Sequence, residues 1–192
     1  LSSWRDRDGD ILETGLHAFF GGYHALHALL RDVGIAHHVL WQPHTLTWAM
    51  PPNFSARWNG VPVFEEFRFV DAPSPFNGIG AVLNARYVFN HWEKLLFAKG
   101  TLPVLLRDHG YADAQDEITY AQWHRKRGMS EHMLATFFAP MALALNFTPV
   151  EKISAEAMLR VMAYFASTRD ASRAGFLDGP PGPRFVEPLA EH

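Results

Sequence analysis

The run from Glu13 to Tyr23 constrains the fold more than any other part of this 192-residue sequence. It contains a carboxylate, a histidine, two adjacent phenylalanines and the pair Gly21-Gly22. Glycine lets the backbone approach a flat ligand closely because it has no Cβ, and adjacent phenylalanines offer rigid apolar walls. An apolar pattern with helical spacing follows directly. We therefore expect this run to lie beside a flat ligand and to lead into a helix.

The N-terminal part of the sequence predicts short strands around one helix. An Asp-Gly turn within residues 4–10 predicts a hairpin whose second strand starts at Ile11. Apolar spacing predicts a helix over 23–33, which Gly34 would end. Alternating apolar residues then predict a strand over 38–50 and an antiparallel partner strand over 61–70.

The rest of the sequence is mostly helical in pattern. Helices are expected over 76–84, 91–106, 119–126, 130–145 and 155–167, with Asn90, Thr119 and Ser154 as N-caps. Residues 180–183 are expected to form a rigid proline-rich loop, and 184–186 a strand. The fold class predicted is α+β, with a small antiparallel sheet and about six helices.

Composition excludes several classes of protein. The net charge is −3, and no basic stripe indicates a nucleic-acid partner. The absence of cysteine excludes disulfides, thiolate zinc sites and cysteine nucleophiles. The 15 phenylalanines and 6 tryptophans fit a Phe-rich core, a large apolar ligand or a membrane contact. Because the first residue is Leu and not Met, we expect a processed or truncated product.

Polar residues with catalytic or ligating potential form no complete motif. His24 and His27 lie three apart on a predicted helix, but zinc needs three or four ligands, so no metal site is predicted. Glu65 and Glu66 are adjacent in a strand and point to opposite faces, which argues against a carboxylate dyad. No GxGxxG or GxxxxGK[ST] motif is present, so the sequence carries no phosphate cradle. No catalytic residue can be assigned.

The segment from Trp92 to Leu106 is a candidate for contact with a membrane surface. Lys94, Lys99 and Arg107 are spaced among its apolar residues, a pattern typical of helices that lie in a bilayer interface. An ordinary amphipathic helix packed on a core would look the same. The candidate contact residues are Trp92, Leu95, Leu96, Phe97, Leu102, Leu105 and Leu106.

Four separated stretches resemble the plant- and cyanobacterial-type carotene desaturases, the phytoene and ζ-carotene desaturases. They are 3–23, then 49–51 with 67–69 and 72–73, then 112–126, and last 142–147 with 165–180. The resemblance implies an FAD-dependent, monotopic membrane enzyme of carotenoid biosynthesis. Such an enzyme dehydrogenates a C40 carotene and passes the electrons to a quinone. It would be located at a plastid or thylakoid membrane, or at a bacterial photosynthetic membrane.

Site residues and domains follow from the same resemblance. It implies cofactor contacts at Glu13, Gly15 and His17, and substrate contacts at Phe19, Phe20, Phe147 and Tyr164. Residues 1–24 would be a remnant of the FAD-binding domain. Residues 25–182 would form a substrate-binding (lid) domain like that of amine-oxidase-like flavoproteins, and 183–192 would start the return to the FAD domain.

The sequence also departs from the family pattern. Family members open with a Rossmann-type glycine-rich segment and close with a segment that completes the FAD domain, and neither is seen here. Tyr164 stands where the phytoene branch has an arginine, although 176–179 resembles that branch. Two hypotheses follow. One is the substrate-binding part of a desaturase. The other is a non-catalytic descendant, such as a scaffold or a carotenoid- or lipid-binding subunit of a membrane complex, for instance a photosynthetic one.

Overall fold

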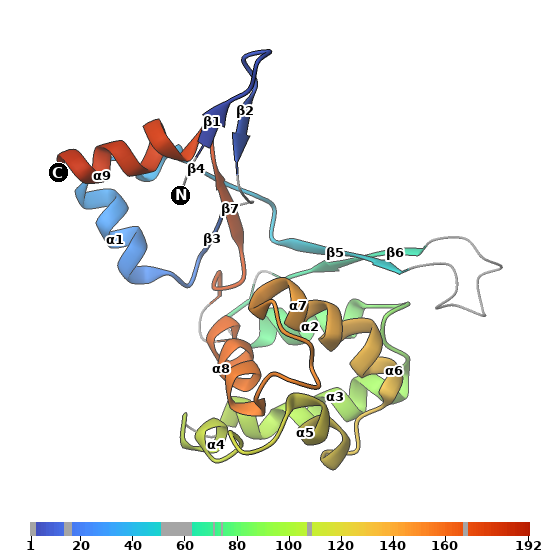
Figure 1. Ribbon diagram of the computed structural model, residues 1–192. Coiled ribbons are helices and arrows are strands. Elements are labelled where there is room, and N and C mark those ends of the chain that lie inside the picture. The colour runs from blue at the N-terminus through green and yellow to red at the C-terminus, as the bar shows by residue number, and fades with distance from the viewer. Residues whose placement is uncertain are drawn as a thin grey trace. The chain divides into compact units, whose positions relative to one another are not determined.

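The computed structural model describes residues 3–13, 17–50, 63–70, 72–73, 75–106, 109–166 and 169–192. Contacts divide the chain into two compact units. Unit 1 combines Leu1–His44 with Asp170–His192, and unit 2 is Thr45–Arg169 (Figure 1).

Unit 1 begins with the predicted hairpin. Strand β1 (Ser3–Arg5) pairs antiparallel with β2 (Ile11–Glu13). In the turn, Asp6 Oδ1 accepts a hydrogen bond from the backbone N–H of Asp10 at 2.9 Å. The aspartate side chain therefore closes the turn between the strands, as aspartate commonly does in turns.

A three-stranded antiparallel sheet forms the centre of unit 1. Its order is β3 (Ala18–Phe20), β7 (Ala174–Leu177), β4 (Val39–Trp41). Strands β3 and β7 were not predicted, because strands this short show no clear alternation. The central strand comes from the far end of the chain, which is why unit 1 is built from two segments.

Helix α1 (His24–Asp32) follows β3 and confirms the predicted helix. It ends before Gly34, whose φ of 81° is a left-handed conformation that glycine adopts without strain. The short helix η1 (Ala36–His38) leads into β4. The buried core of this unit consists of Phe19, Leu30, Ile35 and Val39.

The C-terminal segment of unit 1 is helical. The predictions of a loop over 180–183 and a strand over 184–186 were wrong, because η4 (Gly182–Val186) is a π-helical turn that continues into α9 (Glu187–Glu191). Pro183 is the second residue of η4, where no backbone N–H is needed for intrahelical bonding. The prolines of 180–183 had indicated a rigid loop.

Unit 2 begins with the antiparallel pair β5 (Thr45–Met50) and β6 (Val63–Arg68), as predicted. The single strand expected over 38–50 is two strands, β4 and β5, which belong to different units. The break includes Pro43, which has no N–H to donate to a strand ladder. The expected connecting loop at 51–60 lies outside the described residues.

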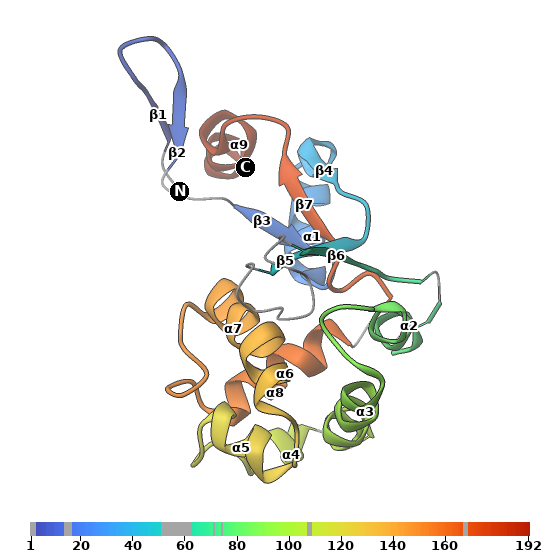
Figure 2. The same cartoon turned by 90° about the vertical axis from the view of Figure 1, so that its right-hand side faces the viewer.

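Most helices of unit 2 lie where the sequence predicted them (Figure 2). They are α2 (Phe76–Asn84), α3 (His91–Leu106), α5 (Tyr120–Lys126) and α8 (Ala155–Phe165), whereas α4 (His109–Asp113) was missed. The predicted caps are confirmed. Asn90 Oδ1 accepts from the N–H of Glu93 at 2.9 Å, and Thr119 forms a capping box with Gln122.

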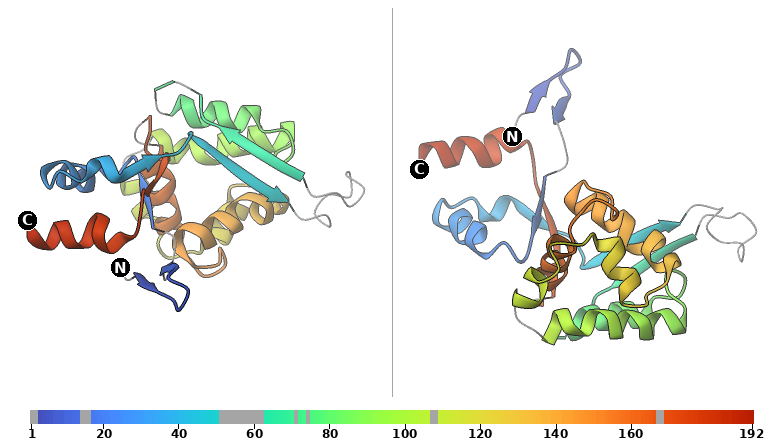
Figure 3. Two further views of the ribbon diagram at one scale, coloured as in Figure 1. Left: turned by 90° about the horizontal axis from the view of Figure 1, so that it is seen from above. Right: turned by 60° about the horizontal axis from the view of Figure 1, so that its bottom comes forward.

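The most apolar helix is continuous but not uniform. It consists of α6 (Glu131–Met133), the π-helical segment η3 (Leu134–Phe138) and α7 (Ala139–Asn146). Its inner face joins a core rich in aromatic rings, which the helices of unit 2 surround (Figure 3). The largest fully buried members of that core are Trp123, Tyr120, Phe89 and Phe138.

The fold class is α+β, as the sequence predicted, but the single small sheet expected is three separate antiparallel sheets in the described part of the chain. The contact-defined units divide at 44/45 and 169/170, whereas the domains expected from the resemblance divide at 24/25 and 182/183. The difference arises because β7 pairs with β3 on one side and with β4 on the other. The functional assignment of those domains stays a prediction.

Candidate functional site

The glycine pair of the opening run is needed for a close backbone approach. A Cβ on Gly21 would lie 2.1 Å from the carbonyl oxygen of Asp170. The N–H groups of Gly21 and Gly22 donate to the carbonyls of Arg173 and Ala171 at 2.9 and 3.1 Å. The partner of this close approach is the turn before β7, and not the flat ligand that we expected.

His17, one of the predicted cofactor contacts, has a buried polar atom without a described partner. Its Nδ1 is buried and has no hydrogen-bond partner within the described part of the chain. The nearest carboxylate oxygen, Glu13 Oε2, is 3.6 Å away, which is beyond hydrogen-bonding distance. A buried polar atom without a partner is costly, so this atom fits a ligand that supplies a polar ring edge. Gly15 lies outside the described residues.

Phe19 and Phe20 have different environments. Phe19 is buried in the core of unit 1, and its ring meets that of Phe185 edge-on at 5.7 Å. The ring of Phe20 is half-buried and packs edge-on against Tyr23, also at 5.7 Å. Its carbonyl is the partner of His27 Nε2 at 2.8 Å. Of the two, Phe20 is the one whose ring reaches the surface of the unit.

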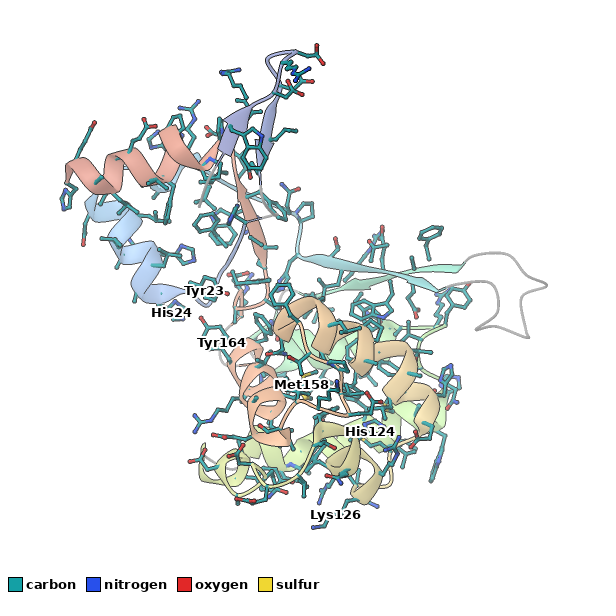
Figure 4. All side chains as sticks on the ribbon, in the orientation of Figure 1. Tyr23, His24, His124, Lys126, Met158 and Tyr164 are labelled. Carbon is teal, nitrogen blue, oxygen red and sulfur yellow. The ribbon has the colours of Figure 1, made fainter. Side chains whose placement is uncertain are left out.

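Phe147 and Tyr164 belong to unit 2. Phe147 follows α7 in a left-handed conformation with φ of 52°, and its side chain is 88% exposed. That conformation costs a non-glycine residue about 1–2 kcal/mol, and burial does not offset it here. Tyr164 lies on α8, is 38% exposed, and its ring meets that of Phe165 edge-on at 5.8 Å (Figure 4). The predicted role of both residues as substrate contacts stays a prediction.

The fold brings together one polar pair that sequence reasoning missed. His44 Nε2 lies 2.8 Å from the hydroxyl oxygen of Ser172. Burial lowers the pKa of His44, an effect that Asp170 opposes. A neutral imidazole at this distance can accept the serine proton or donate its own. The two residues are 128 positions apart, so no local pattern could have indicated the pair.

Helix α3 was expected either to contact a membrane surface or to pack on a core. One of its faces is exposed, and the other packs on the core. Trp92, Leu95 and Leu102 are exposed, with exposed fractions of 67%, 63% and 50%. Leu96 and Phe97 instead pack against the core, where Phe97 stacks on Phe138 at 6.0 Å. The predicted membrane contact therefore remains a candidate at Trp92, Leu95 and Leu102, whereas Leu96 and Phe97 face the core. The side chains of Leu105 and Leu106 lie outside the described part.

The two adjacent carboxylates of β6 point to opposite faces, as predicted. Glu65 is buried and accepts hydrogen bonds from the backbone N–H groups of residues 86–88, including Val88 at 2.6 Å. Glu66 is exposed and pairs with Arg68 at 2.6 Å. Glu65 therefore fixes the connection between α2 and α3 and is not available as a catalytic base.

A second buried carboxylate joins two helices. Glu93 is 3% exposed, and its Oε1 accepts from the hydroxyl of Ser130 at 2.5 Å and contacts His132 Nδ1 at 3.0 Å. These contacts connect the first turn of α3 with the start of α6. Its carboxylate is thus also used within the fold.

Among the described residues, no cluster of three or more His, Asp or Glu side chains could hold a metal ion. In the same part of the chain, no helix has the length and apolar character needed to cross a bilayer.

Comparison with known proteins identifies the class. The sequence matches the flavin containing amine oxidoreductase family over residues 1–176, and the chain belongs to that family. It is 35% identical over 193 residues to a 15-cis-phytoene desaturase of an Oncidium hybrid cultivar and 33% identical over 192 residues to that of Synechococcus elongatus. It is 35% identical over 202 residues to a probable zeta-carotene desaturase of Synechococcus elongatus.

These matches confirm the resemblance seen in the sequence. All of this chain is covered in each case, whereas it spans 32%, 39% and 40% of the three relatives. The chain therefore corresponds to between a third and two fifths of a carotene desaturase in length.

Proposed function

We propose that this chain is the substrate-binding part of an FAD-dependent carotene desaturase, which dehydrogenates a C40 carotene and passes the electrons to a quinone. The observation that carries the proposal is the similarity to phytoene and zeta-carotene desaturases along the whole chain. The identity is 33–36% to the phytoene desaturases and 35% to the zeta-carotene desaturase. The substrate proposed is accordingly phytoene or ζ-carotene.

Exposed aromatic side chains support a long apolar ligand. Phe147 presents its whole ring to the surroundings of unit 2, and Tyr164 presents part of its ring. In unit 1, the half-buried ring of Phe20 offers an apolar wall next to the backbone turn of Gly21. A polyene has no hydrogen-bonding groups, so flat apolar contacts of this kind are what would hold and orient it.

The proposed flavin contacts are Glu13, Gly15 and His17. The unpartnered Nδ1 of His17 fits the polar edge of a flavin ring, and Glu13 would help to orient the imidazole. Bound FAD would supply the hydride acceptor. The sequence contains no glycine-rich phosphate motif, so these residues would meet the ring end of the cofactor and not its pyrophosphate.

The plant relatives of this chain are named chloroplastic/chromoplastic proteins. A C40 hydrocarbon dissolves in lipid and not in water, so its enzyme must take it from a membrane. We therefore propose attachment to the surface of a plastid, thylakoid or bacterial photosynthetic membrane, with lipid, carotene and quinone as partners.

The test is a measurement of cofactor and product on the purified whole enzyme, because a chain without a phosphate cradle is not expected to hold FAD on its own. Flavin content would be determined from absorbance and from fluorescence after unfolding, together with the intact mass. Phytoene or ζ-carotene in vesicles with a quinone would then be followed by chromatography. Bound FAD and a more unsaturated carotene are expected.

Two outcomes would contradict the desaturase proposal. Flavin-free protein that retains carotene would instead support the non-catalytic alternative, a carotenoid- or lipid-binding subunit of a membrane complex. Protein that holds neither flavin nor carotene would support the scaffold form of that alternative. A His17→Ala variant should lower the flavin content, whereas a His37→Ala variant should not, because His37 is exposed and far from Glu13 in sequence.

A further inference from the structure

Exposed apolar side chains gather on two helices of unit 2. On α2 they follow positions i, i+3 and i+7, and on α3 positions i, i+3 and i+10, so each set occupies one side of its helix. We call them the α2–α3 face: Phe76, Ile79, Leu83, Trp92, Leu95 and Leu102. A monomeric soluble protein rarely leaves so many large apolar groups together in water.

The two helices are joined at this face. Lys94 Nζ donates a hydrogen bond to the carbonyl oxygen of Leu83 at 2.7 Å. That carbonyl is in the last turn of α2, where no intrahelical N–H is available. Figure 2 shows α2 and α3 along the same side of unit 2. The opposite sides of both helices are buried, for example at Ala81 and Val104, so the face has a fixed geometry.

The charges around the face are of one sign. Between residues 75 and 104 the sequence has Arg86, Lys94 and Lys99 but a single carboxylate, Glu93. Glu93 is buried and already bonded to Ser130 and His132. A further cation is close by, because Arg127 Nη2 donates to the carbonyl oxygen of Lys99 at 3.4 Å. The exposed apolar residues of the two helices are thus accompanied by cations and by no exposed carboxylate on either helix, in a chain whose net charge is −3.

We propose that the α2–α3 face lies on an anionic lipid bilayer, with its apolar side chains at the acyl boundary and Arg86 and Lys99 at the headgroups. Amphipathic helices with interleaved cations bind such surfaces through apolar area and charge together, and Trp92 suits the interface. A second copy of this chain is a poorer occupant, because two-fold pairing would oppose cations of the same sign. The proposal deepens the proposed function by naming the surface through which the protein would meet the membrane.

Vesicle sedimentation tests the charge requirement. The purified full-length protein would be mixed with sucrose-loaded vesicles of phosphatidylcholine, with or without phosphatidylglycerol. Binding should be stronger to the anionic vesicles and weaken with added salt. Lys99→Gln should lower the partition coefficient about fivefold, since one cation at an anionic surface contributes about 1 kcal/mol. Lys152→Gln, an exposed lysine before α8, is the matched control and should change nothing.

Apolar substitutions test whether α2 takes part. Leu83→Ser and Leu95→Ser should each lower the partition coefficient about tenfold, the effect of losing one inserted leucine side chain. Leu143→Ser is the matched control, because Leu143 is exposed to a similar extent but lies on α7. All three leucines are exposed, so the variants should keep the wild-type thermal midpoint.

Three results would overturn the proposal. The first is a Leu83→Ser variant that binds like the wild type. The second is equal binding to neutral and anionic vesicles. The third is a wild-type protein that ignores vesicles and forms a dimer that Leu95→Ser dissociates. Flavin content and carotene conversion in detergent report on the proposed function separately. Protein that binds anionic vesicles as described but converts no carotene would support the face and contradict the desaturase.

Discussion

Gly21 illustrates how one missing Cβ can hold two distant segments together. The backbone of residues 21–22 bonds to the turn at 170–173, and no side chain would fit between them. That contact connects the start of α1 with the strand that completes the sheet of unit 1. Gly21 is thus explained by backbone packing, and the predicted ligand contacts of the run that the structure describes are Glu13, His17, Phe19 and Phe20.

Gly21→Ala should destabilise unit 1 by about 1–3 kcal/mol, because the added methyl would overlap a backbone oxygen that cannot move freely. Gly78→Ala is the matched control. Gly78 lies in α2 with open space around its Cβ position, so alanine should be neutral or stabilise by up to about 1 kcal/mol. Denaturant unfolding of both variants would measure this, and equal midpoints would contradict the explanation.

Glu65 and Glu66 provide a second contrast between neighbours. Glu65→Gln should cost about 1–3 kcal/mol, because the amide group would set an N–H donor against the backbone N–H donors of residues 86–88. Glu66→Gln loses only a surface ion pair and should stay within about 0.5 kcal/mol of the wild type. Thermal or denaturant unfolding would measure the loss of stability in each variant. A loss in Glu66→Gln as large as that in Glu65→Gln would contradict the different roles of the two carboxylates.

His124 should make the stability of unit 2 depend on pH. It is fully buried, its Nε2 lies 2.8 Å from the carbonyl of Ser130, and its Nδ1 has no partner within the described part. Burial lowers the pKa of His124 below the ordinary value of 6.5. The neutral form therefore stabilises the fold above pH 6.5, and this contribution is lost as the pH falls through the lowered pKa.

The measurement is the free energy of unfolding between about pH 5 and 7, where the wild type should lose stability towards acid. In His124→Gln the free energy of unfolding should change less with pH, because the titrating group is gone while a donor to the carbonyl of Ser130 remains. Identical slopes in the two proteins would exclude His124 as the cause. His44 titrates in the same direction but is present in both proteins, so it cancels in the comparison.

At the scale of elements, α3 contains a proline that the fold accommodates. Pro103 has no N–H, so the carbonyl of Lys99 one turn earlier loses its intrahelical donor. Arg127 Nη2 reaches that carbonyl at 3.4 Å. The guanidinium thus satisfies the backbone oxygen that the proline leaves unpaired, and it connects α3 to the end of α5.

A double-mutant cycle would test whether the Arg127 guanidinium replaces the N–H that Pro103 lacks. Arg127→Met should cost about 1 kcal/mol in the wild type and clearly less in a Pro103→Ala background, where residue 103 regains an N–H for Lys99. Arg125→Met is the control, because Arg125 pairs with Glu131 at the surface and should be additive with Pro103→Ala. Additivity of Arg127 and Pro103 in unfolding experiments would refute the coupling.

At the scale of the whole molecule, unit 1 depends on both ends of the chain. Strand β7 is central and pairs with β3 on one side and β4 on the other. Unit 2 is formed by one continuous segment, Thr45–Arg169. The two units should therefore respond differently to loss of the C-terminal residues.

A chain ended after Arg169 should lose the protection of amides in β3 and β4 against hydrogen exchange, because their partner strand is gone. The amides of Tyr120 and Ala121, which bond within unit 2, should keep theirs. The intact chain is the reference. Retained protection of β3 in the shortened chain would show that the sheet does not need β7.

The sequence by itself determined the elements whose signals are local. The hairpin after Asp6, the helices begun by Asn90, Thr119 and Ser154, and the pairing of β5 with β6 each follow from caps, turns or alternation within a few residues. It also determined the family, because the resemblance is spread along the whole chain.

Only the tertiary structure decided which distant segments meet. It placed β7 between β3 and β4 and brought the backbone of Gly21 against that of Asp170. It also decided which side of α3 packs on the core and which is exposed, and it connected α2 to α3. The physical reason is that burial and backbone pairing act between residues that are far apart in sequence, whereas caps and turns act between neighbours.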